Sequence, residues 1–207
     1  MAEAFSRDKL GEHMARKWPV ILGLLVGLGT LLAGFALGAS VAEQWRLAAR
    51  WTARAGFPLF LATYLASSLV RISPAPWSRA LARDRRWWGL GFATSHTVHF
   101  IALVMATHLS PEPRTIVSLI PGGVAYAFIL LMALTSSNTA MRALGRNWKR
   151  LHAAGIHVIW LIYTLAYAKR IPEPASHNIG LIMTALALTA LAIRLAARRR
   201  QPRPALA

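Results

Sequence analysis

Four histidines inside long apolar runs are the residues of this chain with the widest choice of chemistry: His96, His99, His152 and His157. Imidazole binds iron and other transition metals, carries protons, and is expensive in hydrocarbon unless a partner satisfies its nitrogens. The chain has no cysteine, which excludes thiolate metal sites, iron–sulfur clusters, disulfides and a catalytic thiol. Histidine is therefore the leading candidate for a metal or heme ligand.

Carboxylate chemistry is excluded from the apolar runs, because every acidic residue lies outside them. Proton relays, hydrolysis by paired carboxylates and oxygen cages for hard cations would all need such side chains there. The acidic residues are Glu3, Asp8, Glu12, Glu43, Asp84, Glu112 and Glu173. Imidazole is the side chain that remains within the runs, and redox chemistry at a histidine-bound iron stays possible there.

The spacing of the histidines limits which of them can share a site. His96 and His99 are three residues apart, so a helix places them on nearly the same face. His152 and His157 are five apart, which turns them about 140° from each other on a regular helix. Imidazoles from two neighbouring helices that clamp one iron form the b-type heme arrangement. We expect one histidine from each run to contribute.

The depth of each histidine along its helix is a second criterion for choosing the pair. Counted from the basic residues before each run, His99 lies about 20 Å and His96 about 15 Å inward, against about 3 Å for His152 and about 10 Å for His157. Height therefore pairs His96 with His157, and the pairing stays open.

Each histidine also has a purely structural interpretation. A single intramembrane histidine often bonds a hydroxyl or carbonyl of a neighbouring helix, and this interpretation is favoured for His108 and His157 taken alone. For His99 a ligand role is favoured. His96 is either a ligand or a residue that orients one.

The apolar runs that carry these residues predict an all-α, polytopic integral membrane bundle of six transmembrane helices. The composition is 56% hydrophobic with 15% charged residues, and the net charge of +17 is concentrated between the runs. A span needs about 20 apolar residues. The predicted spans are 18–39, 56–72, 87–109, 117–135, 151–168 and 179–197, of which 56–72 is the shortest. The first charge-free run exceeds the usual core of a signal peptide, so we expect a retained helix.

The distribution of Lys and Arg predicts the orientation. Most of them lie in the N-terminal segment, in 71–86, in 142–150 and in the C-terminal tail, which six spans put on one side. The other side has Arg46, Arg50, Arg54, Arg114, Lys169 and Arg170. By the positive-inside rule we expect a bacterial inner-membrane protein with both termini cytoplasmic. Nucleic acid is not an expected partner, because no soluble basic face is left.

One transmembrane domain accounts for the chain. We expect a cytoplasmic segment at 1–17, the six-helix domain at 18–197 and a basic cytoplasmic tail at 198–207. No Gly-rich phosphate loop follows a strand pattern, so no flavin or nicotinamide site is expected in this chain. Electrons must then come from a quinone pool or a partner redox protein, with membrane lipid around the bundle.

Two blocks of sequence resemble a known family. The first is Arg85-Arg86-x-x-Gly89-Leu90 with His99 ten residues after the glycine. The second is Ala133-Leu134-Thr135-Ser136 followed by Arg142-x-Leu144-Gly145-x-x-Trp148-x-x-Leu151-His152. Together they resemble the ferric reductase-like transmembrane domain over about residues 55–170, and within it the YedZ/MsrQ-type heme-binding membrane subunit of a periplasmic methionine sulfoxide reductase system.

The resemblance implies a membrane oxidoreductase subunit that binds b-type heme and passes electrons across the membrane. It carries over His99 and His152 as axial ligands of the heme iron. The family pattern has a further histidine about 13 residues after the Leu-His pair, and Thr164-Leu165-Ala166 stands there. This departure supports the alternative of a heme-free membrane scaffold or interaction subunit on the same fold. A small transporter is the weakest alternative, because the spans lack acidic coupling residues.

Overall fold

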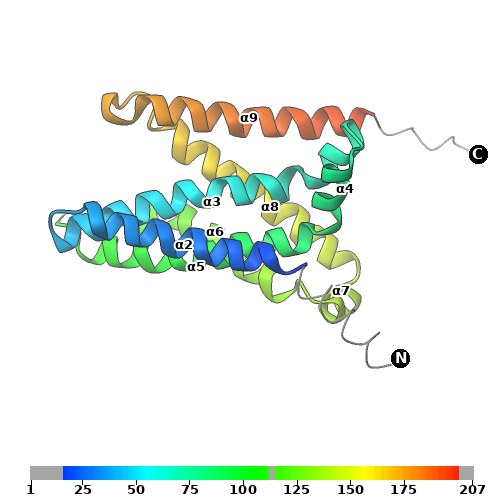
Figure 1. The fold of residues 1–207 in the computed structure, drawn as a ribbon, viewed down its shortest axis with the longest axis horizontal. Coiled ribbons are helices and arrows are strands. Elements are labelled where there is room, and N and C mark those ends of the chain that lie inside the picture. Colours follow the sequence, from blue (N-terminus) through cyan, green and yellow to red (C-terminus); the bar gives the residue numbers. More distant parts are fainter. Residues whose placement is uncertain (1–15, 112–114, 201–207) are drawn as a thin grey trace, which may run out of the picture. The chain divides into compact units, whose positions relative to one another are not determined.

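The computed structural model describes residues 16–111 and 115–200, and this part of the chain consists of helices joined by short turns, without strands. Six helices are long and apolar enough to cross a membrane, which confirms the predicted all-α polytopic class. They are α2 (Trp18–Leu37), α3 (Val41–Ile72), α5 (Arg85–His108), α6 (Ile116–Leu134), α8 (Arg146–Ala168) and α9 (His177–Arg199) (Figure 1). Most of the predicted N-terminal segment and tail lies outside the described residues.

The second of these helices extends well beyond the predicted span 56–72 at its N-terminal end. Helix α3 has 32 residues and is the longest of the described helices, so Arg46, Arg50 and Arg54 lie on it rather than in a loop. Its start is set by a local motif: Ser40 Oγ accepts a hydrogen bond from Glu43 N (3.3 Å), and Glu43 Oε2 accepts one from Ala39 N (3.2 Å). This reciprocal arrangement begins a helix independently of hydropathy.

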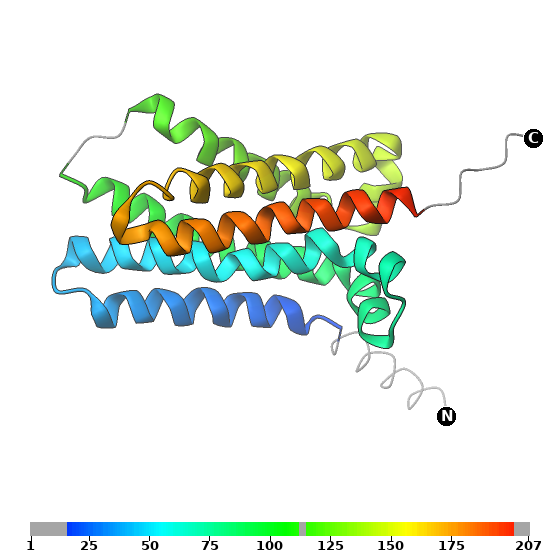
Figure 2. The ribbon, with the colours of Figure 1, turned by 90° about the horizontal axis from the view of Figure 1, so that it is seen from above.

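The chain divides into two compact units, with boundaries inside α3, directly before α5 and near the start of α6. Unit 1 consists of residues 1–63 and 84–118, and unit 2 of residues 64–83 and 119–207. In unit 1, α2 runs beside α5 and beside the first part of α3 (Figure 2). Unit 1 carries His96 and His99, and unit 2 carries His152 and His157.

Helices α2 and α5 approach at backbone distance in unit 1. An added Cβ on Gly23 would lie 2.6 Å from the Gly91 carbonyl carbon, and one on Gly91 would lie 2.8 Å from the Pro19 carbonyl carbon. A Cβ on Gly27 would lie 3.3 Å from the Ser95 Cα. Small residues at such spacing allow close packing in lipid, where hydrophobic burial does not drive association.

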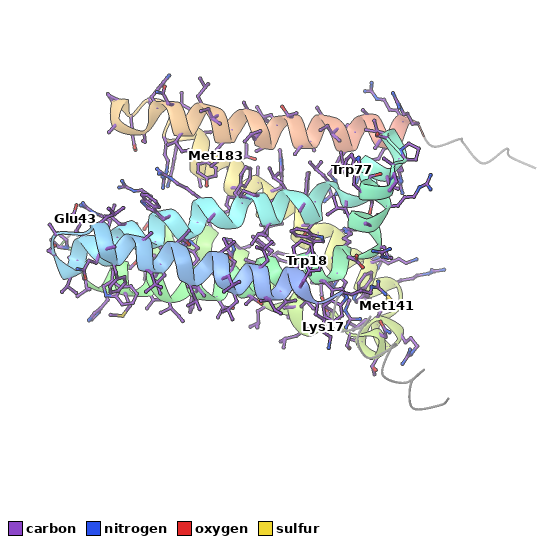
Figure 3. All side chains as sticks on the ribbon, viewed as in Figure 1. Lys17, Trp18, Glu43, Trp77, Met141 and Met183 are labelled. Atoms are coloured by element: carbon purple, nitrogen blue, oxygen red, sulfur yellow. The ribbon has the colours of Figure 1, made fainter. Side chains whose placement is uncertain are left out.

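Polar and aromatic contacts join the first turns of these two helices. Asp84, which precedes α5, accepts a hydrogen bond from Arg16 Nε at 2.9 Å, and the Trp18 and Trp88 rings meet edge to face at 5.0 Å. Figure 3 shows Trp18 and its neighbour Lys17 at this end of α2 and Glu43 at the opposite end of unit 1. Aromatic and basic residues in this position are typical of a membrane–water boundary.

Unit 2 contains the last part of α3, α4 (Pro76–Arg83), α6, α7 (Asn138–Leu144), α8, the short η1 (Pro174–Ser176) and α9. Trp160 Nε1 on α8 donates a hydrogen bond to the Ala187 carbonyl of α9 at 2.8 Å. Ser137 caps α7 by accepting a hydrogen bond from Ala140 N at 3.0 Å. Gly145 has φ of 49°, a conformation that glycine adopts without strain, and its turn directs the chain from α7 into α8.

Candidate functional site

His99 on α5 is tied to α3 through a buried hydroxyl. Its Nδ1 lies 2.9 Å from Thr52 Oγ1, and Thr52 is fully buried. The Thr52 hydroxyl is 2.7 Å from the Ala48 carbonyl oxygen, to which it donates its single hydrogen. Toward His99 the same oxygen can therefore only accept.

This contact is consistent with a His99 ring that donates through Nδ1. In that neutral tautomer Nε2 keeps its lone pair. The Ala49 backbone, also on α3, hydrogen-bonds the same side chain. Metal-bound histidines have this pattern, in which one nitrogen binds the metal and the other donates to an oxygen of the surrounding protein.

His96 fills a packing position in unit 1. Its side chain is buried, and an added Cβ on Gly56 of α3 would lie 2.8 Å from the His96 Nδ1. The Phe92 ring lies 4.1 Å from the imidazole centroid. The α3 backbone and the Phe92 ring thus both pack closely against this imidazole.

His96 and His99 do not clamp one iron between them. Their ring centroids are 5.4 Å apart with planes at 73°, an edge-to-face contact. Two axial ligands must approach the iron from opposite faces of the porphyrin, and for two rings on one helix the porphyrin would have to pass through that helix. The contact instead lets His96 support the orientation of His99.

His152 of unit 2 joins α8 to the C-terminal end of α6. Its Nε2 is 3.1 Å from Thr135 Oγ1, and the Trp148 ring stacks on the imidazole at 4.2 Å and 27°. Trp148 Nε1 also donates a hydrogen bond to the Thr135 carbonyl at 2.9 Å. The Leu-Thr-Ser and Leu-His parts of the second sequence block therefore meet in space.

His157 has different neighbours from His152. Its Nδ1 is 2.7 Å from the Ala153 carbonyl oxygen one turn earlier in α8, and its ring meets the Tyr64 ring edge to face at 5.8 Å. The two histidines of α8 do not share a partner, as their spacing of five residues predicts.

Among the residues that the structure describes, no group of three or more His, Cys, Asp and Glu side chains could hold a bare metal ion. A porphyrin supplies four of the iron ligands itself, so the protein needs to supply only one or two axial ligands. Single histidines such as those on α5 and α8 can supply ligands of that kind.

Two similar proteins connect this arrangement to a family. The chain is 34% identical to the protein-methionine-sulfoxide reductase heme-binding subunit MsrQ of Cronobacter sakazakii over an alignment of 148 residues that covers 64% of this chain and 70% of that protein. It is 32% identical to the same subunit of Salmonella paratyphi B over 159 residues, covering 70% and 73%. The chain belongs to the MsrQ family. No family model matches it, and no solved structure does.

Membership of the MsrQ family confirms the resemblance in the two sequence blocks. The chain is accordingly a multi-pass membrane protein of that family. Sequence reasoning missed Thr52, which precedes both blocks and is 47 residues from His99 along the chain. A threonine in an apolar helix is too common to have been singled out.

Proposed function

We propose that this chain is a b-type heme-binding subunit that transfers electrons across the bacterial inner membrane. The proposal depends on one observation above all: His99, within a membrane-length helix, has its Nδ1 2.9 Å from the buried Thr52 hydroxyl of α3, which leaves Nε2 as the nitrogen for iron. The heme, when bound, supplies a one-electron carrier. The chain has no cysteine for a thioether bond, which excludes a covalently attached c-type heme and agrees with the proposed b type.

The orientation follows from charge. The greater share of Lys and Arg lies on the side of the chain ends, so both termini face the cytoplasm. The donor is a quinol or a separate cytoplasmic reductase, because the sequence contains no motif for flavin or nicotinamide. The acceptor is a partner redox protein on the opposite side, in keeping with the word "subunit" in the names of the relatives.

The optical spectrum of the detergent-purified protein tests heme binding directly. We expect a Soret band and an α-band that sharpen on reduction with dithionite, and a pyridine hemochrome of b type. His99→Ala should abolish or strongly weaken both bands. His108→Ala is the matched control, because His108 ends the same helix and is exposed. A folded, colourless protein that does not take up hemin would favour the heme-free scaffold, which Thr164 at the position of the missing histidine also supports.

A second experiment separates the two donors. Stopped-flow reduction of the ferric protein by a water-soluble quinol should be fast if the quinone pool is the donor. If a flavin reductase with NADH reduces the protein and the quinol does not, the donor is the reductase. Failure of both would contradict an electron-transfer role.

A further inference from the structure

The C-terminal end of α9 places arginines against the last turns of α3, within unit 2. Arg194 Nη1 donates a hydrogen bond to the Tyr64 carbonyl of α3, and the Arg194 Cζ lies 4.3 Å from the centroid of the buried Tyr64 ring. Arg200 Nη1 lies 3.4 Å from the carbonyl oxygen of Ile72, the last residue of α3. Two arginines about 9 Å apart along α9 therefore contact the backbone of α3.

Two further arginines lie beside these contacts, and we call the group of Arg71, Arg194, Arg198 and Arg200 the α3–α9 basic cluster. Arg198 is four residues after Arg194, so a helix places both on one face, and the charges of both act on the Tyr64 side chain. Arg71 is seven residues after Tyr64, which puts it on the same face of α3. Three members of the cluster are exposed: Arg71, Arg198 and Arg200.

The charge of these exposed arginines exceeds what the helix ends around them can offset. Helices α3 and α9 both end here, and each C-terminus carries about half a negative charge, so together they offset about one cation. In the sequence of unit 2 the single acidic residue is Glu173, which precedes the start of α9 and thus belongs to the opposite end of that helix. The cluster is therefore suited to an anionic partner from outside the chain.

The place of the cluster on α9 matches the headgroup layer of a membrane. The polar layer on each side of the hydrocarbon core is about 5–8 Å thick, and the arginines of α9 extend over a similar length. Leu188 and Leu195 are exposed on a neighbouring face of the same helix, as residues in contact with acyl chains are. Trp77 on α4 is 56% exposed at this end of unit 2 (Figure 3), and tryptophan is typical of the membrane–water boundary.

We propose that the α3–α9 basic cluster binds the phosphate of an anionic phospholipid, in the leaflet on the side of the C-terminus. Arg198 and Arg200 hold the phosphate by charge-assisted hydrogen bonds, for which the guanidinium fork has the right geometry. The acyl chains lie against the exposed leucines of α9. A zwitterionic lipid carries its own cation beside the phosphate, so an anionic lipid is preferred. Such a site requires no heme and is present on a heme-free scaffold as well.

Native mass spectrometry of the detergent-purified protein measures the binding of single lipid molecules. We expect phosphatidylglycerol to bind more tightly than phosphatidylcholine. The double substitution Arg198→Gln/Arg200→Gln should weaken phosphatidylglycerol binding by about 25-fold, because each cation near a membrane surface contributes a factor of about five. Arg142→Gln/Lys149→Gln is the matched control and should keep the unsubstituted affinity, because both residues are exposed in unit 2, lie outside the cluster and carry the same total charge.

Three outcomes would overturn the proposal. Equal weakening in the two double variants would mean that the lipid responds to the overall charge and not to this cluster. Equal binding of the two lipids would remove the need for an anionic headgroup and would favour an acidic protein as the partner of the cluster. Displacement of phosphatidylglycerol by inorganic phosphate at the same concentration would indicate a site for a soluble anion, to which acyl chains contribute nothing.

Discussion

At the scale of single residues, the hydrogen-bond partner of each imidazole determines which ring nitrogen can bind a metal. His99 lies against a buried threonine hydroxyl of α3, His157 against a backbone carbonyl of its own helix, and His152 against a threonine hydroxyl of α6. Histidines that look equivalent in the sequence are therefore chemically different in the folded chain.

Thr52→Val should alter a heme held by His99. Valine keeps the shape but removes the acceptor for Nδ1–H, so the imidazole becomes a poorer electron donor to iron. We expect heme affinity to fall by about 10–100-fold, and the midpoint potential to become more positive because the ferric state is less stabilised. Hemin titration and potentiometry measure the two effects.

Thr63→Val is the control for this substitution. Thr63 also lies on α3, and its hydroxyl donates to the Leu59 carbonyl at 3.2 Å. Equal shifts in both variants would mean that the loss of any threonine on α3 disturbs the protein. If neither the heme affinity nor the midpoint potential changes in Thr52→Val, Thr52 does not influence the heme.

Gly56→Ala should disturb the His96 ring specifically. The new methyl group would lie 2.8 Å from the His96 Nδ1, so the ring must move away from α3. We expect a loss of about 1–3 kcal/mol in stability, typical of overpacking. Gly89→Ala is the control, because its added Cβ would meet only Thr63 Cγ2, at an ordinary 3.5 Å. The thermal midpoint in detergent should fall only for Gly56→Ala.

The candidate site was only partly predictable from the sequence. Helical spacing gives the shared face of His96 and His99 and the divergence of His152 from His157, because both depend on rotation per residue alone. The partners Thr52 and Thr135 depend on which helices become neighbours, and spacing along one helix contains no such information. The partners of the histidines could therefore be identified only from the folded structure.

At the scale of elements, hydropathy locates the helices but misplaces some of their ends. The predicted second span began at residue 56 because Arg46, Arg50 and Arg54 were counted as a loop, whereas the helix begins at Val41. Arg46 pairs with Glu43 at 3.1 Å on the exposed first turns of α3. Charges end the part of a helix that lies in hydrocarbon, and local caps end the helix itself.

The close approach of α2 and α5 predicts a strong effect of one methyl group. Gly23→Ala would place a Cβ 2.6 Å from the Gly91 carbonyl carbon, and a backbone group cannot rotate aside. We expect a stability loss toward the upper end of about 1–3 kcal/mol and a lower yield of monodisperse protein. Gly29→Ala on the same helix has nothing within 4 Å of the added Cβ and should behave like the unsubstituted chain. An equal loss of stability in both variants would mean that alanine disturbs helix α2 itself and that the contact with α5 is not the cause.

At the scale of the whole molecule, the number of spans was predictable because length and hydropathy suffice for it. The six predicted runs correspond one to one with the six membrane-length helices. An even number of spans places both ends on one side, and this is also the arrangement that gathers most of the Lys and Arg on a single side. Span count and charge distribution thus support the same topology independently.

The absence of cysteine makes this topology testable by single-site labelling, because the chain itself gives no background. Ser40→Cys and Ala175→Cys, in exposed turns after α2 and before α9, should react with a membrane-impermeant maleimide in cells whose outer membrane has been opened. Ser73→Cys and Thr139→Cys, near the ends of α3 and α6, are also exposed but should react only after the inner membrane is disrupted. Because all four sites are exposed, a difference between the pairs reports the side of the membrane rather than burial. Labelling of Ser73→Cys in intact inner membranes would reverse the proposed orientation, and labelling of only one member of a pair would contradict six spans.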